Sequence, residues 1–317
     1  MDMNLHRLNM LGILKDIYSD PTLCNCLAFK GGTSLMFLYG LPRFSVDLDF
    51  NLLDLSKQGM VFEKIKEIAG KYGSLYDAQE KFFGPVVVLD YGKGERKLKL
   101  EISNREYGNS YEMKSYLGIN MQVMRIEDMF AHKLCALTDR DGLTGRDVFD
   151  IWFFLQGKYP VNKNILETRT GMAFEDYLTK CEDTLEHAGE KKIMQDIGEL
   201  LTPQMKAFVK NSLKAETTAL LSFFKAFPLI SENSPEAMTI DNATVSTRND
   251  GSSFITARIA GFDCPGEKIK DTDLEFYKRL AKEEDKRKCA VNLARKYYAD
   301  WWRRTYNKKD RKSVRKR

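Results

Sequence analysis

Two aspartates one residue apart are the part of this sequence whose chemistry is easiest to define. Asp47 and Asp49 lie in the segment Val46–Phe50, whose alternation of apolar and acidic residues predicts a β-strand. Residues two apart on a strand point to the same face, so both carboxylates leave the sheet together. Like charges side by side resist ionisation unless a cation lies between them, and carboxylate oxygens are ligands that Mg²⁺ prefers. Aspartate is also uncommon in strands, so we favour a metal-binding role over a plain solvent-facing strand.

A glycine pair precedes these aspartates in the chain. Gly31 and Gly32 let the backbone turn sharply and approach a ligand closely. Thr33 or Ser34 is then expected to cap a short helix over Thr33–Tyr39, whose free N–H groups attract phosphate. A plain strand-to-helix turn would also use these glycines, but their short distance from the aspartates favours phosphate binding. Together the two segments predict chemistry on a Mg²⁺-bound nucleoside triphosphate.

A third carboxylate is available from a later strand. In the predicted strand Arg96–Ser103, Glu101 shares the polar face with Lys97 and Lys99. If this strand pairs beside Val46–Phe50, Glu101 comes close to the two aspartates. Strand order does not follow from sequence, and an ordinary solvent-exposed face would explain the same alternation.

Two predicted helices downstream carry further charged residues. Lys133 lies on the flank of the amphipathic segment 127–137, where a surface lysine is also expected. Asp147 and Asp150 share an adjacent face of the segment 147–156. Helix capping by Asp147 and an ion pair between Asp150 and Arg146 are the plain structural alternatives. With the predicted strands, these helices indicate an α/β fold.

The composition is that of an ordinary globular protein. The chain has 317 residues, of which 43% are hydrophobic and 30% charged, so there is room for two domains. It contains no apolar run that reaches the length of a membrane span, and its first residues, MDMNLHRLNM, lack a signal-peptide core. The six cysteines have no paired spacing. We therefore expect a cytoplasmic protein with reduced thiols and no membrane association.

The charge is distributed unevenly along the chain. The segment Lys286–Arg317 contains fourteen Lys or Arg and two Asp, a net charge of about +12, which leaves about −7 for the rest of a chain whose total is +5. An acidic body suits a metal site, and a basic tail suits a polyanion such as RNA. A solvated tail is the alternative. Four aromatic residues lie in this basic segment and are candidates for stacking on bases: Tyr297, Tyr298, Trp301 and Trp302.

Four motifs together give a resemblance to a known family. They are GGTS (31–34), RFSVDLDF (43–50), LEIS (100–103), and HKL with RDVFD (132–134 and 146–150). Across residues 20–225 the chain resembles the AbiEii/AbiGii-type toxins of bacterial abortive-infection and toxin–antitoxin systems, which have a nucleotidyltransferase-like fold. The resemblance implies a catalytic domain with a small mixed sheet over 1–125 and a helical domain over 126–230 that completes the active site. Residues 231–317 lie outside the resemblance, and a hairpin with basic helices is expected there from the sequence pattern alone. The hairpin follows from strand patterns flanking Asn249-Asp250-Gly251.

The resemblance also implies roles for the motif residues. It implies that the GGTS motif holds the nucleotide phosphates, that Ser45 and Arg43 line the same pocket, with Arg43 pairing with phosphate, and that Lys133 contacts the triphosphate. Asp147 matches the acidic position of the last motif. The expected catalytic set is Asp47, Asp49, Lys133, Asp147, Ser45 and Glu101; the expected nucleotide-binding set is Gly31, Gly32, Thr33, Ser34, Arg43 and Lys133; the expected metal ligands are Asp47, Asp49 and Glu101.

The reaction implied is attack of an acceptor hydroxyl on the α-phosphate of a nucleoside triphosphate, with pyrophosphate leaving. A toxin of this kind modifies tRNA or another RNA, blocks translation in phage defence, and has an antitoxin. Two alternatives remain: transfer to a protein side chain or to a small molecule such as an aminoglycoside, and a non-catalytic nucleic-acid binder.

Overall fold

The chain folds into two compact units, which we describe one at a time. A computed structural model describes residues 2–139, 143–231, 240–248, 250–259 and 261–314; in the last range, the side chains of 299–300 and 302–314 are not described. Unit 1 comprises Met1–Asn104 and Asn109–Ser234, and unit 2 comprises Arg105–Gly108 and Pro235–Arg317. Within the described residues, no helix is both long enough and apolar enough to cross a lipid bilayer. All six cysteines are unpaired, as their spacing predicted.

Unit 1 is built on a mixed β-sheet, which within the described residues has seven strands in the order β3-β4-β5-β2-β1-β7-β6. The neighbours β2 and β5 are parallel, as are β1 and β7, and the other pairs are antiparallel. The predicted pairing of the Glu101 strand beside the aspartate strand is therefore confirmed. The strands are β1 (Leu27–Lys30), β2 (Asp47–Leu52), β3 (Ser74–Lys81), β4 (Gly84–Asp90), β5 (Leu98–Ser103), β6 (Tyr111–Tyr116) and β7 (Ile119–Met124).

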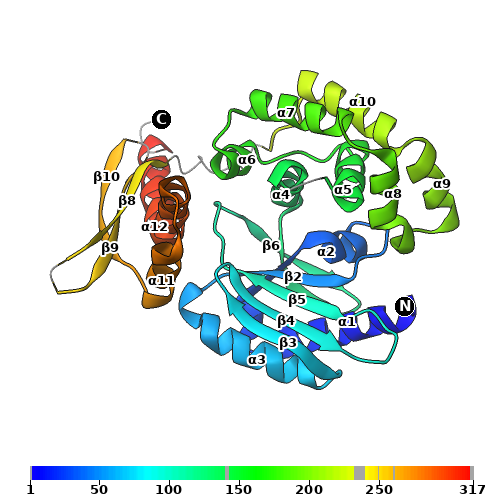
Figure 1. Cartoon of the computed structure of the whole chain (residues 1–317), viewed down its shortest axis with the longest axis horizontal. Helices are drawn as coiled ribbons and strands as arrows, with labels where there is room; N and C mark the ends of the chain where they lie inside the picture. Colours follow the sequence, from blue (N-terminus) through cyan, green and yellow to red (C-terminus); the bar gives the residue numbers. More distant parts are fainter. Residues whose placement is uncertain (1, 140–142, 232–239, 249, 260, 315–317) are drawn as a thin grey trace. The chain divides into compact units, whose positions relative to one another are not determined.

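Helices lie against both faces of this sheet (Figure 1). Helices α1 (Met3–Ser19) and α3 (Gln58–Gly70) cover one face, and α2 (Gly31–Leu38) lies on the other. The covered face is apolar because alternate strand residues such as Leu48, Phe50 and Leu100 point into it and are fully buried. The acidic residues of β2 therefore point to the face on which α2 lies.

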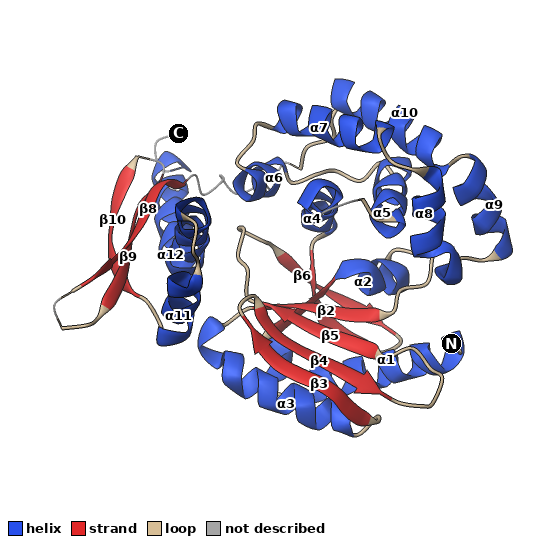
Figure 2. Cartoon of the chain, in the orientation of Figure 1, coloured by secondary structure: helices blue, strands red, loops and turns tan. Residues whose placement is uncertain are grey.

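The rest of unit 1 is helical (Figure 2). Its core includes the stacked rings of Phe130 and Phe154, whose centroids are 4.7 Å apart. These rings join the first two helices of this part, which carry the predicted lysine and aspartates. The helices are α4 (Ile126–Asp139), α5 (Gly145–Gln156), α6 (Lys163–Thr170), α7 (Phe174–Glu186), α8 (Glu190–Ile197), α9 (Pro203–Asn211) and α10 (Leu213–Ala226).

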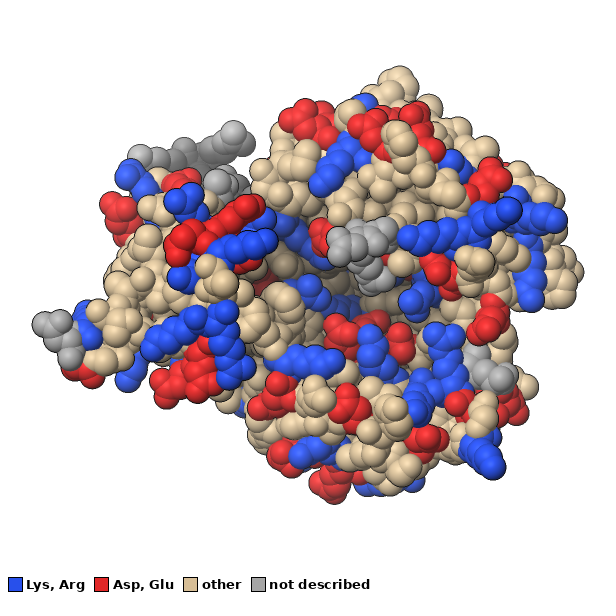
Figure 3. Space-filling model, in the orientation of Figure 1, with Lys and Arg blue, Asp and Glu red and all other residues tan. Residues whose placement is uncertain are grey.

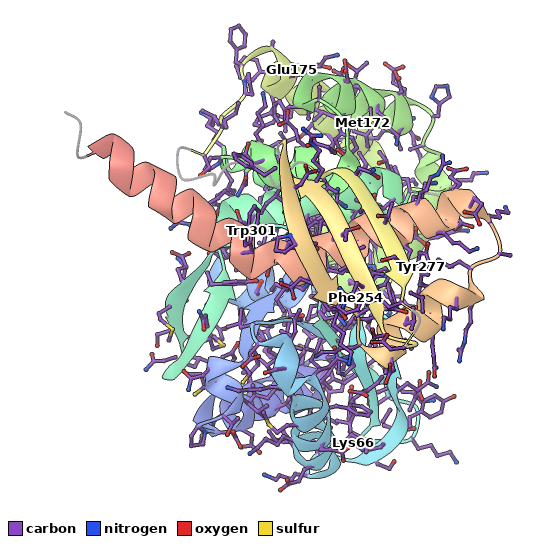
Figure 4. All side chains as sticks on the ribbon, turned by 90° about the vertical axis from the view of Figure 1, so that its left-hand side faces the viewer. Lys66, Met172, Glu175, Phe254, Tyr277 and Trp301 are labelled. Carbon is purple, nitrogen blue, oxygen red and sulfur yellow. The ribbon has the colours of Figure 1, made fainter. Side chains whose placement is uncertain are left out.

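Unit 2 is a small antiparallel sheet packed on a long helix. Its described strands have the order β10-β9-β8, and the sheet lies across α12 (Figure 4). Tyr298 is fully buried there and donates to the carbonyl oxygens of Ile255 and Pro265, so the expectation that it stacks on bases is wrong. Trp302 lies outside the described side chains. The elements are β8 (Ile240–Thr247), β9 (Ser253–Ile259), β10 (Phe262–Lys268), α11 (Asp271–Arg279) and α12 (Glu283–Val314).

Candidate active site

The register of two parallel strands aligns the predicted carboxylates. Asp49 on β2 is the register partner of Glu101 on β5, and Asp47 is the partner of Lys99. All four side chains are half-buried. Burial raises the pKa of Asp49, and the negative charges of Asp47 and Glu101 raise it further. The site therefore holds three carboxylates whose mutual repulsion a bound cation would relieve.

Two lysines offset part of this negative charge. The Nζ atom of Lys99 lies 2.9 Å from Oε2 of Glu101, and Lys30 on β1 is the register partner of Asp49. Burial lowers the pKa of Lys99, but Glu101 and Asp47 outweigh this and raise it overall. Sequence reasoning named neither lysine as part of the site. The signal was present for Lys99, because it shares the strand face of Glu101.

The donor set fits a hard divalent cation by its chemistry. Carboxylate oxygens on adjacent strands are the ligand type that Mg²⁺ takes, and Asp49 has two further carboxylates, Asp47 and Glu101, whose charges raise its pKa in addition to the effect of burial. The oxygens are not arranged as a finished metal cage: among the described residues, no three His, Cys, Asp or Glu side chains form such a group. Asp47, Asp49 and Glu101 as metal ligands thus stay a prediction that their donor chemistry supports.

The glycine pair forms the turn between β1 and α2. Gly31 has a φ of +82°, and a Cβ atom there would lie 2.4 Å from Oδ2 of Asp49. A Cβ atom on Gly32 would lie 2.8 Å from both Nη2 of Arg43 and Oγ of Ser45. The turn is therefore packed directly against the aspartate strand and the loop before it, and a side chain at either position would push these groups away.

The expected capping of this helix by a hydroxyl is wrong. Helix α2 begins at Gly31, and its N-cap residue, Lys30, makes no side-chain capping bond. Thr33 donates instead from Oγ1 to the carbonyl oxygen of Asp47, and Ser34 donates from Oγ to the carbonyl oxygen of Gly31. Because the helix starts two residues earlier than predicted, both hydroxyls lie inside it. Thr33 thereby connects the helix to the aspartate strand.

A buried ion network connects the loop before β2 to α4 and α5. Arg43 binds both carboxylate oxygens of Asp150 through Nε and Nη2, each at 2.7 Å, and Nζ of Lys133 lies 2.7 Å from Oδ2 of the same carboxylate. Burial disfavours the charged form of Asp150, but the positive charges of Arg43 and Lys133 outweigh it and lower its pKa. The alternative partner Arg146 is therefore wrong for Asp150. Since Arg43 is bound here, its contact with phosphate stays a prediction.

Asp147 contributes to the same network from the first turn of α5. Its Oδ1 atom lies 3.8 Å from Nζ of Lys133, and its Oδ2 atom accepts a hydrogen bond from Oγ1 of Thr144 at 2.6 Å. Thr144, not Asp147, is the N-cap of α5, so the capping alternative is wrong. The side chain of Lys133 is 20% exposed, so part of this side chain is accessible to a ligand.

The residues form two clusters within unit 1. One contains the carboxylates with the glycine turn, and the other contains Lys133 with its aspartates; Arg43 and Ser45 lie against Gly32, and Arg43 links the clusters through Asp150. On the face that Figure 3 shows, unit 1 is hollowed near its middle, with acidic and basic side chains along the rim. Such an arrangement can hold a polyphosphate between a cation site and basic groups.

Comparison with known proteins defines the class. The family model described as nucleotidyl transferase AbiEii toxin, type IV toxin–antitoxin system, matches residues 12–233, and the chain belongs to this family. It is therefore a nucleotidyltransferase, and its mixed α/β fold is of that type.

The solved structures that resemble this chain have low sequence identity to it. JHP933 from Helicobacter pylori is 22% identical, with a TM-score of 0.42 over 71% of this chain and 95% of that one. The nucleotidyltransferase toxin MenT4 from Mycobacterium tuberculosis is 17% identical, with a TM-score of 0.45 over 69% of this chain and 84% of that one. The comparison with curated proteins found no match.

Proposed function

We propose that this protein is a Mg²⁺-dependent toxin that transfers a nucleoside monophosphate from a nucleoside triphosphate to a hydroxyl of tRNA or another RNA and thereby blocks translation. The observation that carries the proposal is the strand register that pairs Asp49 with Glu101 beside the Gly31–Gly32 turn. Acidic ligands, a phosphate-binding turn and a basic group from a second part of the unit are what phosphoryl-group chemistry requires.

Each cluster has a role in this proposal. Asp47, Asp49 and Glu101 would hold Mg²⁺, which when bound neutralises triphosphate charge and lowers the pKa of the acceptor hydroxyl. The Gly31–Gly32 turn lets backbone N–H groups approach the phosphates. Lys133 would contact the triphosphate, with Asp147 and Asp150 fixing its ammonium. Ser45 and Arg43 support the turn from behind Gly32.

The setting of the reaction is also proposed. We assign the segments 1–125 and 126–230 to catalysis; apart from Arg105–Gly108, both belong to unit 1. The segment after residue 231 is assigned to RNA binding, since fourteen of its residues after 285 are Lys or Arg. We place the protein in the cytoplasm as a phage-defence toxin with an antitoxin partner, in keeping with its family.

The test is an assay with all four labelled nucleoside triphosphates, Mg²⁺, total RNA and total protein. We expect label in RNA, no label without Mg²⁺, and none with Asp47→Asn or Asp49→Asn. Label in protein or in an added aminoglycoside would show that this molecule, and not RNA, is the acceptor. If a variant that combines Asp47→Asn and Asp49→Asn still arrests growth while RNA stays unlabelled, the protein is better explained as a non-catalytic binder.

A further inference from the structure

Lys99 lies among the three carboxylates because of strand register. It precedes Glu101 by two residues on the same face of β5, and its register partner on β2 is Asp47. Its Nζ atom is 2.9 Å from Oε2 of Glu101, and the two side chains are 37% and 36% exposed. The ammonium thus takes up a carboxylate oxygen that the proposed metal site would need.

Lys99 lowers the net negative charge of the carboxylate row. Lys99 and Lys30, which is the register partner of Asp49, share this row of the sheet with the three carboxylates. The formal charges of these five described groups sum to −1 with Lys99 and to −2 without it. A unit charge within several ångströms changes the binding constant of a divalent ion by roughly tenfold or more at a low effective dielectric, and by less where solvent and salt screen it.

We propose that Lys99 is an internal counter-ion that neutralises Glu101 until a metal ion takes this carboxylate, and that its ammonium then pairs with the triphosphate. The inference rests on the proposed metal site and deepens it. A lysine suits this role because its compact charge sits on a flexible four-carbon stem, whereas an arginine would hold the carboxylate through a rigid fork. The Gly31 turn, which packs on Asp49, brings the proposed phosphate site close to the same row.

The exchange makes metal and nucleotide binding cooperative. Without nucleotide, a metal ion has to displace the ammonium of Lys99 from Glu101, which weakens its binding. With nucleotide, the displaced ammonium finds a new anionic partner, so each ligand favours the other by the same factor. Positioning of the triphosphate, not a step at the reacting atoms, is therefore the role of Lys99.

The experiment is a titration of the full-length protein with Mn²⁺, without nucleotide, followed by calorimetry and by the loss of free Mn²⁺ signal in electron paramagnetic resonance. Lys99→Met is expected to bind Mn²⁺ roughly threefold to tenfold more tightly than the unsubstituted protein. Lys97→Met is the matched control: it removes the same charge two residues away, where the ammonium lies over the ring of Tyr76, 2.9 Å from its centroid. It should bind Mn²⁺ like the unsubstituted protein.

A second arm measures a non-hydrolysable triphosphate at saturating Mn²⁺. Lys99→Met should bind it roughly threefold to tenfold more weakly, whereas Lys97→Met should not. Lys99→Gln serves in the same two arms if the methionine variant does not melt cooperatively. Unchanged or weaker Mn²⁺ binding by both Lys99 variants would overturn the counter-ion role while leaving the metal site standing. No Mn²⁺ binding by the unsubstituted protein would defeat the proposed metal site, and the role of Lys99 with it.

Discussion

At the scale of single residues, Asp150 has the most demanding environment in the candidate site. Its carboxylate is fully buried and is held by the fork of Arg43 and the ammonium of Lys133. A buried charge is tolerated only when partners and hydrogen bonds replace the lost water, and here two cations from two other elements do so. Asp150 and Arg43 therefore hold Lys133, the lysine that the proposed reaction uses, in a fixed orientation within the fold.

Replacing Asp150 should be costly for this reason. Asp150→Asn leaves two buried or half-buried cations without their anion, and we expect a loss of about 3–5 kcal/mol in the free energy of unfolding, measured by urea denaturation. Asp147→Asn is the control, because Asp147 reaches Lys133 only at 3.8 Å and keeps its Thr144 contact through a single oxygen. Equal losses in both variants, or a loss under about 1 kcal/mol for Asp150→Asn, would contradict the assignment.

Asp128, on the first turn of α4, gives a pH dependence of known sign. It is fully buried, and burial raises its pKa to about 7, although donors from Ser110 and Asn162 act in the opposite direction. Between its unfolded pKa of about 4 and this value, the folded state binds the extra proton. Stability should therefore fall as the pH rises from about 4 to about 7 and level off above, by at most about 4 kcal/mol.

The measurement is the unfolding free energy of the protein and of Asp128→Asn from pH 4.5 to 8.5. The amide stays neutral, so the difference between the two curves isolates the titration of Asp128 from that of all other carboxylates. The unsubstituted protein should lose stability relative to the variant as the pH rises to about 7. Parallel curves would show that Asp128 titrates normally in the folded state.

At the scale of elements, the β1–α2 turn shows how local sequence and tertiary packing combine. Two independent constraints require glycine at position 31. Its φ of +82° is unfavourable for residues with a side chain, and Asp49 occupies the space that a Cβ atom would take. The sequence alone indicated the turn but placed the helix start two residues late. The error arose because hydroxyl residues after a glycine pair are typical N-caps, and only packing shows that Thr33 binds the carbonyl of Asp47 instead.

Two glycines allow these two effects to be separated by experiment. Gly40 has a similar φ of +73° but nothing within 4 Å of the position of a Cβ atom. Gly40→Ala should therefore lose only about 1–2 kcal/mol of stability from backbone strain. Gly31→Ala should lose that and also displace Asp49, so that Mn²⁺ and nucleotide binding fall at least about tenfold at protein concentrations where both variants are folded. Normal binding of Mn²⁺ and nucleotide by Gly31→Ala would show that the β1–α2 turn does not contribute to the binding site.

Several strands with a buried face were predicted, but β7, which buries Met121 and Val123, was missed. The strand with Glu101 was found because Leu98, Leu100 and Ile102 alternate with charged residues, and all three are fully buried. The edge strands β3 and β6 were missed, since their residues are mostly exposed or half-buried and give no alternation. Strand β10 contains Pro265 and Gly266, which argue against a strand in any sequence-based reading.

At the scale of the whole molecule, the contacts that sequence could not supply are the long-range ones. Arg43 and Asp150 lie 107 residues apart, and no local pattern connects an arginine before a strand to an aspartate inside a helix. The carboxylate row was predictable only as a condition on strand order, which the fold then met. Family resemblance supplied the motifs, but the way in which Asp150 joins Arg43 to Lys133 comes from the three-dimensional arrangement.

The basic segment Lys286–Arg317 is expected to bind RNA, and this can be tested. Lys308, Lys309 and Arg311 belong to the segment that carries about twelve net positive charges. If this segment binds RNA phosphates, each neutralised phosphate releases counter-ions, and the logarithm of the affinity falls with the logarithm of the salt concentration. Replacing all three residues by Gln should weaken tRNA binding and make that slope shallower by about 2–3.

Fluorescence anisotropy with labelled tRNA over a range of KCl concentrations measures the slope directly. The control replaces Lys191, Lys206 and Lys210 by Gln; these residues are exposed on α8 and α9, so the net charge changes by the same amount. A general effect of net charge would act at long range in both variants and would be screened to the same extent at high salt. If both variants lose the same slope, the effect is one of net charge, and the basic segment Lys286–Arg317 has no special role in RNA binding.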